Sequence, residues 1–167
     1  MIIPGTLESG PATRWPLMSA LPPVAALTTA PGIARAYVRG VLADWRLGGV
    51  SEVAELVASE MVANSVAAST APAGGLVYVG GRTPVIRVCV MSDRAQVLIE
   101  CHDEAPGQPQ LRDVDPWTAE TGRGLAIVDA LTARNWGWQP APGGGKVVWA
   151  ALATPGGTPE SASGRPR

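Results

Sequence analysis

Apolar residues recur at two spacings along the chain, and each spacing predicts a different kind of element. In the first run the apolar residues lie four positions apart, as on one face of a helix: Ile33, Tyr37, Val41 and Trp45. Thr29 and Pro31 stand just before this run, where a capping residue and an early proline favour a helix start. The pattern therefore predicts a helix from about Pro31 to Arg46.

A second helix is predicted from Ser51 to about Ser69. Gly48 and Gly49 interrupt the first helix, and serine is a residue type that caps helix starts. The apolar side of the second helix is supplied by Val53, Leu56, Val57 and Val66.

Runs rich in β-branched residues predict strands in the second half of the chain. Residues 84–91 and 95–102 form one predicted hairpin, and residues 136–139 and 146–152 form another. Helical spacing returns between the hairpins, over residues 122–135. Helices before and between the strands indicate an α+β fold, a two-layer α/β sandwich with a mixed, mainly antiparallel sheet.

The two ends of the chain differ from this pattern. Residues 1–13 and 154–167 are rich in Gly, Pro and Ser without periodicity, so we expect loose tails around one domain at 14–153. The start does not resemble a signal peptide, and Pro22 and Pro23 interrupt the apolar run near it. These features predict a cytoplasmic protein without a membrane partner.

Charge and cysteine content narrow the classes of partner. The net charge is −1 and basic residues are scattered, whereas nucleic acids and anionic membranes require clustered Lys and Arg. We therefore expect no direct nucleic-acid contact. The only lysine, Lys146, follows three glycines and is expected to lie on the surface beside a turn. Cys89 and Cys101 are too few for a disulfide framework and are expected to be free, buried thiols on adjacent strands.

Glu60 and Asn64 are the first candidate site. They lie four residues apart in the second predicted helix, so they share one face with Cβ atoms about 5–6 Å apart. A solvated face is the simplest interpretation of an arbitrary Glu/Asn pair. Here, however, the flanking residues are mostly Ala, Val, Leu and Met, and burying a carboxylate without a donor or cation is costly. Mg²⁺ suits the pair, because Asn offers a carbonyl ligand while Glu stays free to accept a proton.

The second candidate site is the end of a predicted strand at Asp103, followed by Pro106 and Gly107. A carboxylate there can accept a hydrogen bond from the exocyclic amine of adenine, and a nearby glycine lets the backbone approach the flat ring. Taken alone, the same pattern is more often only a turn.

The third candidate site is a glycine-bearing helix start, Gly122-Arg123-Gly124-Leu125. Free N–H groups at a helix N-terminus attract phosphate, and glycines allow its close approach. Glycines also precede many helices that bind nothing. Two interpretations of Arg123 remain open, a phosphate contact or a solvated residue of the first turn.

The order of these three motifs is far more specific than any one of them. In this order the chain resembles the GHKL ATP-binding superfamily, and most closely the small anti-sigma-factor serine/threonine kinases of bacterial partner switching. The resemblance covers about residues 30 to 153 and implies the Bergerat ATP-binding fold. The single histidine, His102, stands at a strand end beside an acid, which argues against a histidine kinase.

The resemblance implies a role for each residue of the motifs. Glu60 matches the general base and Asn64 the Mg²⁺ ligand, while Asp103 matches the adenine-recognising acid and Gly107 the glycine that follows it. The segment 104–121 resembles a lid over ATP.

The phosphate side is matched by Gly122 and Gly124, with Arg123 and Leu125 beside them. The implied function is transfer of the ATP γ-phosphate to a Ser or Thr of an antagonist (anti-anti-sigma) protein, which controls a sigma factor. A homodimer is a possible oligomeric state.

One residue departs from the family pattern. Ala105 stands where many members have a glycine two residues after the acid. This departure favours a second hypothesis, a nucleotide-gated module that sequesters a regulatory partner without phosphorylating it. A nonspecific ATPase is a third hypothesis.

Overall fold

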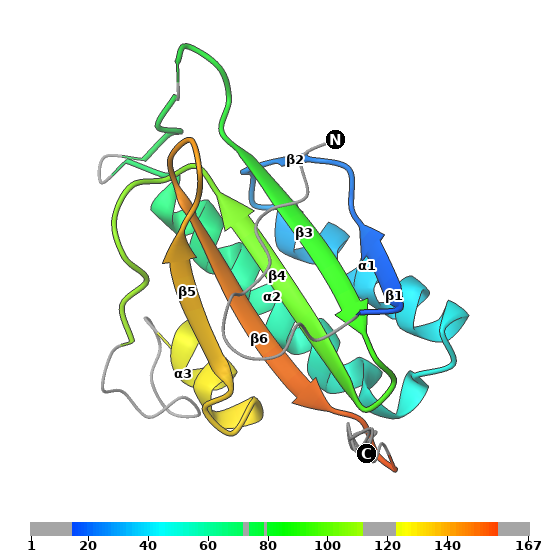
Figure 1. The fold of residues 1–167 in the computed structure, drawn as a ribbon. Helices are drawn as coiled ribbons and strands as arrows, with labels where there is room; N and C mark the ends of the chain where they lie inside the picture. Colours follow the sequence, from blue (N-terminus) through cyan, green and yellow to red (C-terminus); the bar gives the residue numbers. More distant parts are fainter. Residues whose placement is uncertain (1–14, 72–73, 79, 112–122, 157–167) are drawn as a thin grey trace, which may run out of the picture.

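A computed structural model describes residues 15–71, 74–78, 80–111 and 123–156. Its sheet has six strands in the order β1-β3-β4-β6-β5, and β2 pairs with β3 on the same side as β1 (Figure 1). All these pairings are antiparallel. The strands are β1 (Leu17–Ala20), β2 (Val24–Ala25), β3 (Val85–Ser92), β4 (Gln96–Asp103), β5 (Trp136–Pro140) and β6 (Lys146–Ala153).

The helices cover one face of this sheet (Figure 1). They are α1 (Ala30–Asp44), α2 (Ser51–Ala68) and α3 (Gly124–Leu131), with a short 3₁₀ turn (Gly48–Val50) between α1 and α2. The central helix, α2, packs against α1 on one side and α3 on the other. Apolar side chains on the sheet-facing side of α2 are buried, among them Val57, Met61 and Val62. The fold is therefore a two-layer α/β sandwich, as the sequence predicts.

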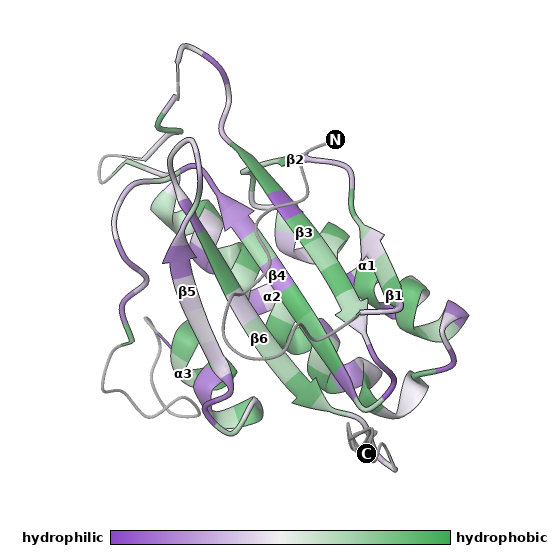
Figure 2. Ribbon diagram, viewed as in Figure 1, coloured by the Kyte–Doolittle hydropathy of each residue, from purple (hydrophilic) through white to green (hydrophobic). Residues whose placement is uncertain are grey.

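Both predicted hairpins are present, within two residues of their predicted ends. Their alternation is visible in β3, where Ile86, Val88 and Val90 are buried in the main core and the residues between them are less buried. Figure 2 shows hydrophobic residues concentrated along β3, β4 and β6. Cys101 faces the helices and Cys89 is less buried; both are free and lie on adjacent strands, as expected.

The predicted helices differ from the observed ones in detail. In α1 the buried side is formed by small residues such as Ala30, Ala34 and Val38, whereas Ile33 is 44% exposed, so the predicted apolar stripe is wrong by about one position. Ser51 does not cap α2, because its hydroxyl donates to Glu55 Oε1 at 2.9 Å. The third helix is shorter than the predicted range of residues 122–135.

Strands β1 and β2 were not predicted. Both are short and lack a clear alternation, and they form by hydrogen bonding to β3 at the sheet edge. Within the described ranges, no helix has the length and apolar character needed to cross a membrane.

The turn between β5 and β6 folds tightly over the end of β4. Gly145 has a left-handed backbone, with φ of +78°, and a β-carbon built on it would collide with the carbonyl oxygen of Asp103 and lie 2.7 Å from Glu104 Cα. Only a glycine permits both the backbone angle and this approach. Gly145 therefore holds the start of β6 against the end of β4.

We predict that Gly145→Ala destabilises the fold by more than Gly144→Ala does. Gly144 lies in the same turn with φ of +106°, but a β-carbon there meets no atom within 4 Å. The control substitution should cost about 1–3 kcal/mol for backbone strain alone. The collision at Gly145 should add about 1–3 kcal/mol. Urea unfolding of both variants measures the difference, and equal losses would contradict the close approach.

Candidate functional site

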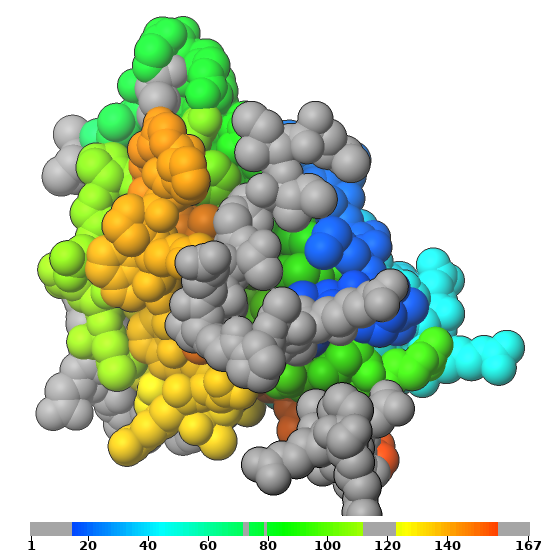
Figure 3. All heavy atoms as spheres, in the orientation of Figure 1, coloured from blue at the N-terminus to red at the C-terminus, as the bar shows by residue number. Residues whose placement is uncertain are grey.

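A cavity of about 440 Å³ opens between α2, the segment after β4 and the start of α3. Its wall includes Asn64 and Ser65 of α2, Asp103 at the end of β4, and Leu125 of α3. Residues 106–110 close one side, and Figure 3 shows the chain after β4 running beside β5 along that flank of the molecule. The three segments singled out from the sequence thus border one cavity.

Glu60 and Asn64 meet the start of α3 directly. A β-carbon on Gly124 would lie 3.0 Å from Asn64 Nδ2 and 3.1 Å from both Asn64 Oδ1 and Glu60 Oε2. These distances are too short for a comfortable contact, so the missing side chain of Gly124 makes room for both polar groups. The structure therefore brings together three of the predicted site residues.

The burial at this pair differs from the expectation. Glu60 is only half-buried, so the cost of a buried carboxylate does not apply to it. The buried group is instead the Asn64 amide nitrogen, which has no hydrogen-bond partner among the described residues. A buried polar atom without a partner is unusual in folded proteins and costs free energy. This orphaned amide marks the position where a polar ligand would be accommodated.

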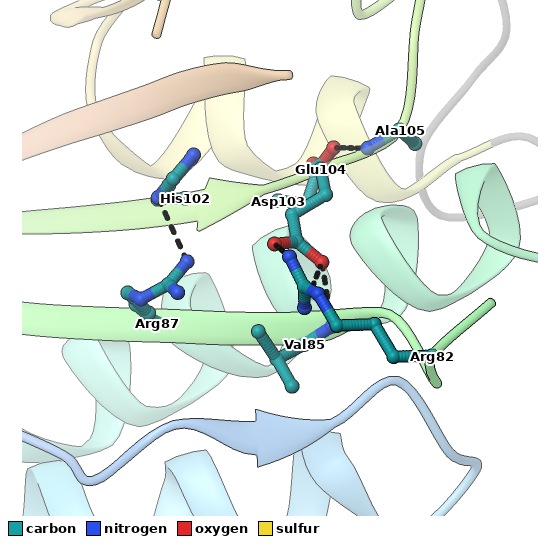
Figure 4. A network of polar contacts seen from close by, with 7 residues as sticks. All are labelled: Arg82, Val85, Arg87, His102, Asp103, Glu104 and Ala105. Atoms are coloured by element: carbon teal, nitrogen blue, oxygen red, sulfur yellow. Dashed lines mark hydrogen bonds and ion pairs between the residues drawn. The ribbon is translucent and has the colours of Figure 1, made fainter. Parts of the chain in front are cut away.

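Asp103 is fully buried at the end of β4, and three donors hold its carboxylate. Ser65 Oγ donates to Oδ2 at 2.9 Å, and Lys146 Nζ donates to Oδ1 at 2.7 Å. The backbone N–H of Ala105 also donates to Oδ1, at 3.0 Å, as seen at the strand end in Figure 4. The charge of Asp103 is therefore paired and oriented at the inner end of the cavity.

Lys146 is a cavity-lining residue whose position the sequence does not predict. It was expected on the surface, but its side chain is only 6% exposed and lines the cavity. The register pairs Lys146 directly with Asp103 across β4 and β6. Spacing along the chain does not reveal this register. The available signal is a single lysine at the start of a predicted strand and two adjacent acids, Asp103 and Glu104, just after another.

The segment after Asp103 is fixed at its first two residues. Glu104 accepts hydrogen bonds from Arg82 and from the backbone N–H of Val85, and the Arg82 guanidinium lowers the pKa of the Glu104 carboxyl (Figure 4). Ala105 is buried. Gly107 has φ of +91° in open space, which lets the chain turn along the cavity between Pro106 and Gln108.

The phosphate-side motif is only partly described by the structure. Gly122 and residues 112–121 of the predicted lid lie outside the described residues. Arg123 is exposed and precedes the first turn of α3, while Leu125 is buried and lines the cavity. The first bond within α3 runs from Ile127 N to Arg123 O, so the N–H groups of Gly124 and Leu125 precede the helical ladder.

Cys101 and His102, close to Asp103, are both held in their uncharged forms. Burial raises the pKa of the Cys101 thiol to about 12, and this thiol lies 3.4 Å from Ser65 Oγ. Burial and the nearby Arg87 guanidinium lower the pKa of His102, which keeps the imidazole neutral at pH 7 (Figure 4). The Cys101 thiol is therefore not poised as a nucleophile, because a thiolate rather than a thiol attacks.

The site therefore has two chemically different ends. We call the buried Asp103–Lys146 pair the inner end, and Asn64 with the adjoining Glu60 and Gly124 the outer end. The described residues contain no group of three or more His, Cys, Asp or Glu that could hold a metal ion by themselves. Comparison with models of known protein families and with curated proteins found no match.

We predict that Lys146→Met is strongly destabilising. The substitution leaves the Asp103 carboxylate buried without its cation, which typically costs about 3–5 kcal/mol. The control is Arg134→Met, which removes an ion pair with Asp129 in which the two side chains are 88% and 26% exposed. Solvent screens that pair, so the loss should be far smaller. Urea unfolding tests the contrast, and similar losses would show that Lys146 is not a buried partner.

Proposed function

We propose that the protein binds Mg²⁺-ATP in this cavity and transfers the γ-phosphate to a Ser or Thr hydroxyl of an antagonist protein, thereby controlling a sigma factor by partner switching. The observation that carries the proposal is the contact of Gly124 with both Glu60 and Asn64. This contact brings the Glu60/Asn64 motif and the glycine motif at Gly124 together. Both lie beside a cavity lined by Asp103, the third motif of the ATP-binding family that the sequence resembles. The cavity volume lies within the range of small-molecule sites.

The two ends of the cavity suit the two ends of ATP. Asp103 is an oriented, buried acceptor for the amino group of adenine. Met61, Leu125 and Val148 line the cavity and offer apolar contact to a flat ring. The phosphates would lie toward Gly124 and Leu125, whose backbone N–H groups precede the helical ladder of α3 and attract negative charge.

The residues at the outer end fit a phosphate-bound Mg²⁺. Asn64 would supply its neutral carbonyl oxygen to the ion, while its amide nitrogen, which lacks a partner among the described residues, would donate to a phosphate oxygen. Mg²⁺ commonly takes one or two protein oxygens and completes its shell with phosphate oxygens and waters. When bound, the ion neutralises charge on the transferring phosphate.

Glu60 is positioned to act as the general base. It lies one helical turn before Asn64, is half-buried, and approaches Gly124 at the outer end. Its carboxylate would take the proton of the incoming hydroxyl while the hydroxyl oxygen bonds to the γ-phosphorus. The bond from the γ-phosphorus to the β–γ bridging oxygen breaks, and ADP leaves.

A binding module without phosphotransfer is the second candidate function. Ala105 favours it, because its buried side chain and its N–H bond to Asp103 hold the start of the lid segment rigidly where the family often has glycine. Nucleotide binding without transfer to any antagonist would distinguish this candidate from the kinase.

We predict that Glu60→Gln retains Mg²⁺-ATP binding and loses phosphotransfer by about 10²–10⁴-fold, the usual contribution of a positioned base. The experiment incubates the protein with γ-labelled ATP and a panel of anti-anti-sigma proteins, and measures ATP affinity by calorimetry. The control is Glu52→Gln, which removes an exposed carboxylate from the first turn of the same helix. Undiminished transfer by Glu60→Gln would refute the role given to Glu60.

A further inference from the structure

We propose that Lys146 is a second base-recognition residue, which donates a hydrogen bond to ring nitrogen N1 of adenine while Asp103 accepts one from the 6-amino group. This inference rests on the proposed ATP binding and assigns a role to a residue outside all three motifs. It makes the buried ion pair, rather than the acid alone, the feature that selects the base.

Two of the three N–H donors of Lys146 have partners among the described residues, which leaves one for a ligand. Its ammonium has three N–H donors. One goes to Asp103 Oδ1 at 2.7 Å and one to the carbonyl oxygen of Ala105 at 3.3 Å. No third acceptor for Lys146 occurs among the residues that the structure describes, and the side chain lines the cavity. The remaining N–H is therefore available only toward the cavity.

Asp103, beside this donor, has an acceptor position that no donor among the described residues occupies. An ionised carboxylate offers about four acceptor positions. Among the described residues, Oδ1 accepts from Lys146 and the Ala105 N–H, whereas Oδ2 accepts from Ser65 alone. One acceptor position thus stays open on Oδ2. The pair presents an acceptor and a donor next to each other at the floor of the cavity.

The Watson–Crick edge of adenine has the matching order, because its 6-amino donor is adjacent to the N1 acceptor. The short Asp103–Lys146 contact and the direct register of β4 and β6 fix the spacing of the two protein groups. Burial of both side chains excludes water as a competitor, which strengthens hydrogen bonds to charged groups.

The test compares three nucleotides on the unaltered protein, each with Mg²⁺ and by calorimetry. 1-Deaza-ATP lacks only the N1 acceptor, and 7-deaza-ATP is the matched control that keeps N1. Loss of one hydrogen bond to a charged donor should weaken binding of 1-deaza-ATP by about 10- to 100-fold relative to ATP. 7-Deaza-ATP should bind within about 3-fold of ATP, a difference well under one such hydrogen bond.

The outcomes separate this inference from the proposed function. If ATP and 1-deaza-ATP bind equally, the role of Lys146 is overturned while ATP binding stands. If ATP itself does not bind, the proposed function fails and the inference fails with it. Lys146→Met gives a second measurement where circular dichroism shows that it folds, because this variant should bind ATP and 1-deaza-ATP equally. Continued discrimination by that variant would also overturn the inference.

Discussion

The buried ion pair between Asp103 and Lys146 is the interaction on which the rest of the structure depends. Two charges can be removed from water only if they pair closely and their remaining hydrogen-bonding groups are satisfied. Here Ser65 of α2 and the Ala105 backbone also donate to Asp103, so one carboxylate ties a helix, a strand end and a loop to the last strand. Gly145 makes the pair possible by letting the last hairpin approach the end of β4.

A second constraint acts at the other end of the cavity. The absence of a side chain at Gly124 lets α3 begin against Glu60 and Asn64, and it leaves a buried amide nitrogen without a partner among the described residues. The inner end of the cavity thus holds an ion pair, Asp103 with Lys146. The outer end holds the Asn64 amide nitrogen, which lacks a hydrogen-bond partner among the described residues. This asymmetry fits a long ligand with a base at one end and phosphates at the other.

The sequence predicts the sandwich and its hairpins because these depend on local patterns, above all the β-branched alternation of β3 and β4. It also finds Glu60, Asn64 and Asp103, since each stands at a defined place in its element. Lys146 is misplaced because strand register is not a local property. The stripe of α1 is misplaced because buried alanines carry little apolar signal. Strands β1 and β2 depend on the edge of β3 and have no pattern of their own.

Amide hydrogen exchange with and without Mg²⁺-ATP tests the central claim most directly, that one cavity joins three separated segments into a nucleotide site. The account predicts slower exchange on nucleotide addition in three places together: the second half of α2, residues 103–111 after β4, and the first turn of α3. Mg²⁺ alone is the control, and α1 should be unchanged. Slowing in only one of these segments, or none at all at saturating nucleotide, would contradict the account.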